Sequence, residues 1–276
     1  MKLALNGATT MKADLETDIR AAAAAGFDYL EIWAAKLREF LRSRTTADLK
    51  ALFAAGGISP YSINSIERIS FSPLDEQDAR RTECEELCRI ASEIECPYVV
   101  VVPGPKPEGI DREGVVAESV RALDLHIRIA ERFGVNLAFE FLGQPGCSVQ
   151  TLDLAREIVE RLDAPNVGLV LDSFHFYAGG STIESLDALD ADRLFIFHIN
   201  DAEDLPRDRL EDRHRLLPGL GILPLKEIIA ALARKGYDRV ASVEIFRPEY
   251  WERDPFALAR EARQATARAL AEGNNR

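Results

Sequence analysis

The sequence predicts a single (β/α)8 TIM barrel over residues 1–276, and three observations favour this fold class. Short β-branched runs alternate with amphipathic or Ala-rich runs about eight times. Eight such units in 276 residues match a barrel of about 250 residues. Continuously apolar runs such as Tyr98–Val102 are typical of parallel strands buried on both faces. No Pro/Gly/Ser-rich linker divides the chain, so we expect one domain.

Each unit is expected to begin with a strand and to continue with a helix. The expected strands are Leu3–Ala8, Tyr29–Trp33, Ser59–Ile66, Tyr98–Pro103, Asn136–Leu142, Val167–Phe176, Leu194–Asn200 and Val240–Phe246. The expected helices are Ala13–Ala25, Thr46–Ala55, Asp75–Ile94, Arg112–Phe133, Thr151–Leu162, Ser181–Leu189, Leu225–Lys235 and Pro255–Ala271. Glycines such as Gly26 and Gly134 follow helical runs, as helix stops do. The longest segment expected to be irregular is Asp201–Gly221, and a loop of that length is usually functional.

Composition excludes several classes of protein. An apolar share of 47% and a charged share of 29% indicate a folded globular chain. The net charge of −12 argues against sequence-independent binding of nucleic acid, which needs an excess of Lys and Arg. We find neither an apolar run long enough to span a membrane nor a signal peptide. The four cysteines form no CxxC pair, which favours reduced thiols and a cytoplasmic location.

Four residues that can bind a metal stand at the ends of the last four strands. They are Glu140, Asp172, His198 and Glu244. Because parallel strands of a barrel end around one mouth, we expect these side chains to converge there. Each alone has an ordinary explanation, as a capping carboxylate, a salt-bridge partner or a core histidine. Three acids buried together are costly unless a cation neutralises them, so the set predicts one divalent ion, with Mn²⁺, Mg²⁺, Co²⁺ and Zn²⁺ all open.

Four more polar residues are expected near the same mouth. His175 follows Asp172 by three residues, and Arg215 lies in the long loop before Pro218-Gly219. Asn6 and Asn64, near the ends of strands one and three, have amides that can hydrogen-bond a substrate hydroxyl. The alternatives are that His175 packs on the loop, that Arg215 is a solvated cation, and that the asparagines hold turns.

These motifs resemble those of a known family. The resemblance covers essentially the whole chain and is carried by Asn6–Thr10, Ala138–Phe141, Val167–Phe176, His198–Asp204 with Pro218-Gly219, and Ser242–Tyr250. The sequence resembles the sugar isomerase/epimerase family with a xylose-isomerase-like barrel, and within it the inosose (2-keto-myo-inositol) isomerases. It departs from the pattern at Gly7, where an acidic residue is expected, and at Gln144, where a histidine is expected.

The resemblance implies a function and a set of roles. The family's metal ligands correspond to the four strand-end residues above, and its substrate-binding His and Arg correspond to His175 and Arg215. The implied reaction is the interconversion of 2-keto-myo-inositol and 1-keto-D-chiro-inositol, a step of inositol catabolism with a polyol or keto-sugar as substrate. Glu140 and Glu244 would then transfer protons on either side of an enediolate.

Other functions stay open at this point. A ketose 3-epimerase or a dehydratase of the same barrel family would use the same metal and glutamates. A non-catalytic sugar-binding barrel would bind the ligand without turnover. A DNA-repair endonuclease is disfavoured, because only four histidines are present and the net charge is negative. The sequence leaves open the native metal, the choice of base between the two glutamates, and the oligomeric state.

Overall fold

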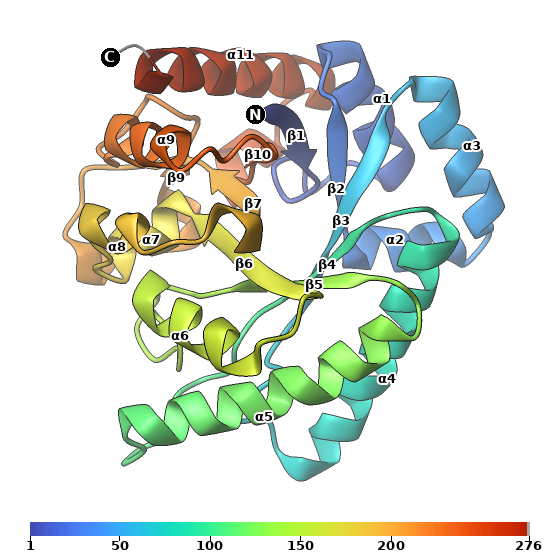
Figure 1. Ribbon diagram of the computed structural model, residues 1–276. Helices are drawn as coiled ribbons and strands as arrows, with labels where there is room; N and C mark the ends of the chain where they lie inside the picture. Colours follow the sequence, from blue (N-terminus) through green and yellow to red (C-terminus); the bar gives the residue numbers. More distant parts are fainter. Residues whose placement is uncertain (275–276) are drawn as a thin grey trace.

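Eight parallel strands close into a barrel in the computed structural model, which describes residues 1–274 (Figure 1). The order around the barrel is β1-β10-β7-β6-β5-β4-β3-β2, so strands that follow one another in the sequence are neighbours. The strands are β1 Lys2–Asn6, β2 Tyr29–Trp33, β3 Ser59–Ile66, β4 Tyr98–Val101, β5 Asn136–Glu140, β6 Val167–Asp172, β7 Leu194–Ile199 and β10 Val240–Val243. The predicted fold class is confirmed.

Helices surround the barrel, and their starts follow from local sequence. The long helices are α1 Leu15–Ala25, α3 Thr46–Gly56, α4 Leu74–Glu93, α5 Arg112–Glu131, α6 Leu152–Leu162, α9 Leu225–Arg234 and α11 Pro255–Asn274. The shorter ones are α2 Ala34–Leu41, α7 Ser173–Ala178, α8 Ile183–Asp187 and α10 Pro248–Trp251. Thr45 and Asp48 form a reciprocal capping box at the start of α3. The last helix, α11, packs between α1 and α9 and so completes the helical ring (Figure 1).

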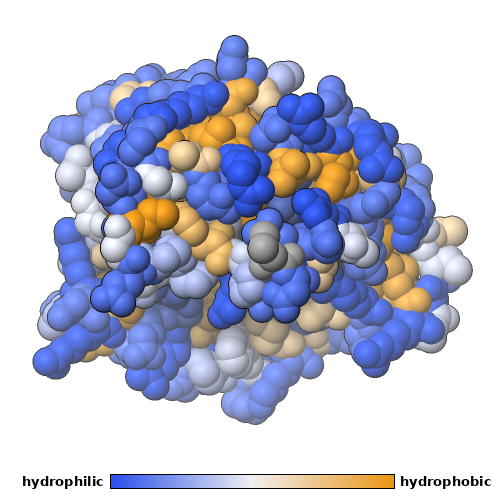
Figure 2. Space-filling view, turned by 90° about the horizontal axis from the view of Figure 1, so that it is seen from below, coloured by the Kyte–Doolittle hydropathy of each residue, from blue (hydrophilic) through white to orange (hydrophobic). Residues whose placement is uncertain are grey.

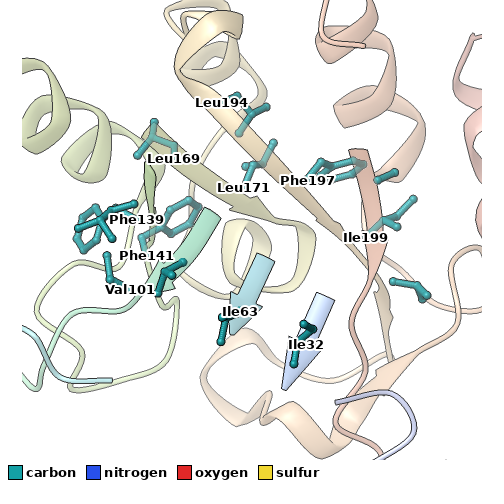
Figure 3. Close-up of a cluster of buried hydrophobic side chains, with 14 of the residues drawn as sticks. Ile32, Ile63, Val101, Phe139, Phe141, Leu169, Leu171, Leu194, Phe197 and Ile199 are labelled. Atoms are coloured by element: carbon teal, nitrogen blue, oxygen red, sulfur yellow. The ribbon is translucent and has the colours of Figure 1, made fainter. Parts of the chain in front are cut away.

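Alternate residues of each strand point to opposite sides of the barrel wall, and this alternation determines which strand-end residues face the mouth of the barrel. Phe139, Leu171 and Phe197 belong to the apolar layer between strands and helices, part of which Figure 3 shows. Ala138, Val170, Ile196 and Val240 belong to a second cluster that fills the barrel interior. Two residues further along β5, β6 and β7 lie the three strand-end ligand candidates Glu140, Asp172 and His198. The mouth of the barrel is therefore the continuation of its inner face.

Two expectations about the segments at the carboxyl ends of β6 and β7 need correction. The strand expected over Val167–Phe176 ends at Asp172, because the Asp172 carboxylate accepts a hydrogen bond from the His175 backbone N–H at 2.9 Å and caps α7. The segment 201–221 is not irregular throughout. Within it, β8 (Asp201–Ala202) pairs antiparallel with β9 (Arg215–Leu216), between which lie the short 3-10 helices η2 (Arg207–Arg209) and η3 (Asp212–His214).

The outer surface is largely hydrophilic on the face that Figure 2 draws, with hydrophobic residues in separate patches. Among the described residues, no helix combines the length and the apolar character needed to cross a bilayer.

Candidate metal centre

The four strand-end residues come together at the mouth of the barrel. Glu140 ends β5, Asp172 ends β6, His198 is the penultimate residue of β7, and Glu244 follows β10 directly. Each offers one ligand atom, and these atoms lie within 4.8 Å of one another. All four residues are buried.

The His198 ring fixes how this group is arranged. Its Nδ1 faces the carboxylates of the other three residues, at 3.0 Å from Glu140 Oε1, 3.3 Å from Glu244 Oε2 and 3.9 Å from Asp172 Oδ2. Its Nε2 points to the other side, 2.8 Å from Glu31 Oε2. The ring is fully buried. Nδ1 is therefore the ring nitrogen that could join the carboxylates in binding an ion.

Sequence reasoning did not single out Glu31. It lies in the middle of β2, within Tyr29-Leu30-Glu31-Ile32-Trp33, and pairs in register with Asn6 at the end of β1. Because the strands of a barrel are staggered, a residue in the middle of one strand reaches the same level as the end of its neighbour. A carboxylate between the two buried apolar residues Leu30 and Ile32 is the signal that could have found it.

Burial and neighbouring charges shift the pKa values of the centre. Burial raises the pKa of Glu140 to about 7, although the adjacent His198 opposes this rise. Burial alone would lower the pKa of His198, but the carboxylates of Glu244, Glu31 and Glu140 raise it well above its usual value. Burial would also raise the pKa of Glu244, but His198 and Arg215 outweigh this effect and hold the pKa below its usual value.

These donors fit one divalent cation. Carboxylate oxygens and one imidazole nitrogen suit Zn²⁺, Mn²⁺ and similar ions. The crowding of three carboxylates in a buried site also calls for positive charge, which protons supply when no ion is bound. The geometry therefore agrees with the predicted ligand set and with a single ion.

Arg215 is not a solvated loop cation; it is 1% exposed and lies against the centre. Its Nη1 donates to Asp172 Oδ2 at 2.8 Å and to Glu244 Oε2 at 3.0 Å. Its Nη2 pairs with Asp212 Oδ1 at 2.9 Å and lies 3.0 Å from His175 Nε2. Because a guanidinium only donates, His175 Nε2 must accept, and the proton of the neutral ring is then on Nδ1. Burial lowers the pKa of His175, which favours this neutral form.

The two predicted asparagines contact a ligand candidate. Asn6 Nδ2 donates to Glu244 Oε1 at 3.1 Å, and Asn64 Nδ2 donates to the same oxygen at 2.9 Å. Both side chains are buried. Their amides therefore fix the orientation of the Glu244 carboxylate, which sequence reasoning had not anticipated.

A cavity of about 660 Å³ opens onto the centre. Its lining combines polar groups of the site with an apolar wall that includes Trp33 and Phe246, whose rings meet edge to face at 5.6 Å. Gln144 lines the cavity and donates to Asp212, which in turn holds Arg215. Gly7 is outside this lining; its carbonyl accepts from Lys36 Nζ at 2.9 Å. Of the two departures from the family pattern, Gln144 is thus the one that faces the cavity.

Comparison with known proteins supports this description. The family model described as xylose isomerase-like TIM barrel matches residues 19–269. The inosose isomerase of Bacillus velezensis is 38% identical over 270 residues, covering 96% of each chain. That of Bacillus subtilis is 39% identical over 256 residues, covering 91% of each chain. A crystal structure of the IolI protein with a binding zinc atom superposes with a TM-score of 0.96 at 36% identity, covering 100% of both chains.

Proposed function

This chain belongs to the xylose isomerase-like TIM barrel family, and from that premise we propose that it is an inosose isomerase dependent on one divalent metal ion. The reaction is the interconversion of 2-keto-myo-inositol and 1-keto-D-chiro-inositol. The observation that carries the proposal is the buried group of three carboxylates and one imidazole, two of whose members, Glu140 and Glu244, line the cavity. The cavity volume of about 660 Å³ falls in the range of small-molecule sites. Four free cysteines among the described residues support a cytoplasmic location.

Two glutamates are available for proton transfer. Both Glu140, which ends β5, and Glu244, which directly follows β10, line the cavity. One removes the proton from the carbon next to the ketone, and the other delivers a proton to the former carbonyl carbon. The hydroxyl proton on the first carbon passes to the former ketone oxygen, so the ketone and the hydroxyl exchange positions. The hydrogen moves as a proton, so no nicotinamide is needed. Stabilisation of the developing negative charge is the chemistry that a divalent cation held by the four ligands supplies when bound.

Arg215 and His175 are proposed to bind the substrate oxygens. Both line the cavity beside Glu140 and Glu244. The Arg215 guanidinium lies over the rings of Phe174 and Phe246, at 4.8 and 5.1 Å from their centroids, and these contacts help to fix its orientation before substrate arrives. His175 Nδ1 has no hydrogen-bond partner among the described residues, which leaves a donor for a hydroxyl.

Proton exchange in heavy water tests the proposal. Wild-type protein loaded with Zn²⁺ should incorporate deuterium into the keto-inositol, as followed by proton NMR, and should form the isomer. Glu140→Gln should reduce both rates by at least about 100-fold, because one proton-transfer group is lost. Exchange at wild-type rate in Glu140→Gln, or binding without any exchange in the wild type, would refute the reaction. The second result would indicate a sugar-binding barrel.

Substrate screening separates the rival enzymes. A ketose 3-epimerase would turn over ketohexoses in preference to keto-inositol, and a dehydratase would release water and form an unsaturated product. The proposal predicts isomerisation of the keto-inositol and no loss of hydroxyl.

A further inference from the structure

Glu31 is a fully buried carboxylate whose hydrogen-bond partners belong to the strands of the barrel. Its Oε2 is 2.8 Å from His198 Nε2. The same oxygen accepts from Asn6 Nδ2 at 3.2 Å, and Oε1 accepts from the Ser62 hydroxyl. Glu31 is not among the residues that line the cavity.

The two nitrogens of the His198 ring have different neighbours, and this difference determines the tautomer. Nδ1 lies among three candidate metal ligands, whereas Nε2 lies against Glu31. A nitrogen that binds a metal must offer its lone pair, so the ring proton of the neutral form belongs on Nε2. An ionised carboxylate only accepts hydrogen bonds. Glu31 therefore favours the one tautomer in which Nδ1 is free to bind an ion.

Glu31 is itself held from both sides. Ser62 on β3 donates to one oxygen and Asn6 on β1 to the other. The Asn6 amide also donates to Glu244 Oε1 at 3.1 Å, so a single side chain connects Glu31 to one of the candidate ligands. The carboxylate that faces the His198 ring therefore has a fixed orientation. Rotation of this carboxylate would break its hydrogen bonds with Ser62 and Asn6.

We propose that Glu31 is a positioning residue for the metal centre: it accepts the Nε2–H of His198, holds the ring, and presents Nδ1 to the ion. This inference rests on the proposed metal-dependent function. It adds a residue that touches neither the substrate nor the metal and acts only through His198. A carboxylate that orients a metal-binding histidine typically changes metal affinity by about 10–100-fold when it is lost.

The test measures zinc binding and the state of the histidine rings, with no substrate present. Zn²⁺ affinity is determined by competition with a chelator in the wild type, Glu31→Leu and Glu31→Gln. Leu is similar in size and accepts no hydrogen bond, whereas the Gln amide oxygen can still accept from Nε2–H. Asp18→Asn is the matched control, because Asp18 is another fully buried carboxylate, and its side-chain partners are Lys36 and Thr10 rather than a candidate ligand.

We expect Glu31→Leu to weaken zinc binding by about 10–100-fold, Glu31→Gln to weaken it less, and Asp18→Asn to leave it unchanged. Long-range proton–nitrogen correlation spectra of the four histidines should show one zinc-dependent ring that is protonated on Nε2 and coordinated through Nδ1. This spectrum of the wild type keeps the inference testable even if Glu31→Leu fails to fold.

Two results would overturn the inference while leaving the metal centre intact. One is wild-type zinc affinity in Glu31→Leu, and the other is coordination of His198 through Nε2 in the wild type. Wild-type protein that binds no Zn²⁺ would instead refute the metal centre, and the role of Glu31 with it.

Discussion

Zinc affinity should fall steeply as the pH is lowered from 8 to 6, because protons occupy two of the ligands in the metal-free protein. Burial raises the pKa of Glu140 to about 7. The surrounding carboxylates, acting against burial, raise the pKa of His198 well above its usual value. An ion can bind these groups only when they are deprotonated, so binding releases their protons. Lower pH therefore favours the protonated, metal-free form, and affinity rises with pH.

The size of the effect follows from the two groups. Because the pKa of Glu140 is centred in this window, its titration alone weakens binding about tenfold between pH 8 and pH 6. The raised pKa of His198 adds to this effect in the same direction, so the total should exceed about tenfold. Chelator competition at each pH gives the affinity, and calorimetry in two buffers counts the protons released. An affinity that varies by less than about threefold across the window would refute this account of the charges.

Three further substitutions test the packing and charge around the site. Arg215→Met leaves two ligand carboxylates without their buried cation and should destabilise the metal-free protein by about 3–5 kcal/mol in urea unfolding, with zinc restoring part of the loss. Lys36→Met removes the partner of Asp18, whose pKa burial raises to about 7 against the opposing charge of Lys36. Its cost should therefore grow from pH 5.5 to pH 8, because the ion pair that is lost forms only where the wild-type carboxyl is ionised; equal costs at both pH values would contradict the pairing. Gly179→Ala would bring a Cβ into steric overlap with the Gln150 carbonyl oxygen, and should lower stability by about 1–3 kcal/mol in thermal unfolding. An unchanged midpoint in either the first or the third variant would count against the packing described.

The ligand candidates can be predicted from the sequence because the barrel topology places them by a simple rule. Apolar strands with a carboxylate or histidine at their carboxyl ends converge at one mouth, whatever the helices outside do. The rule looked only at the last residues of each strand. It therefore does not predict Glu31, which lies in the middle of β2. The stagger between β1 and β2 brings Glu31 level with Asn6.

Contacts made by loops were harder to predict. Arg215 reaches the centre because β8 and β9 pair over two residues each, and a ladder that short leaves almost no periodic pattern in the sequence. The strand expected over Val167–Phe176 ended early for a related reason. The Asp172 side chain both faces the centre and caps α7, and the apolar residues that follow read equally well as strand or helix.

The charges of the metal centre predict that the barrel folds both with and without the ion. Among the described residues, Glu31, Glu140, Asp172 and Glu244 face His198 within 4 Å, a number of acids that burial alone would disfavour. In the metal-free protein, protons on the Glu140 carboxyl and the His198 ring reduce this negative charge. A divalent ion that displaces these two protons leaves the net charge of the centre unchanged. Folding therefore need not wait for the metal, and zinc should raise the midpoint of unfolding only by the mass action of its binding. A barrel that remained unfolded until zinc was added would show that proton-for-metal replacement is not what balances this site.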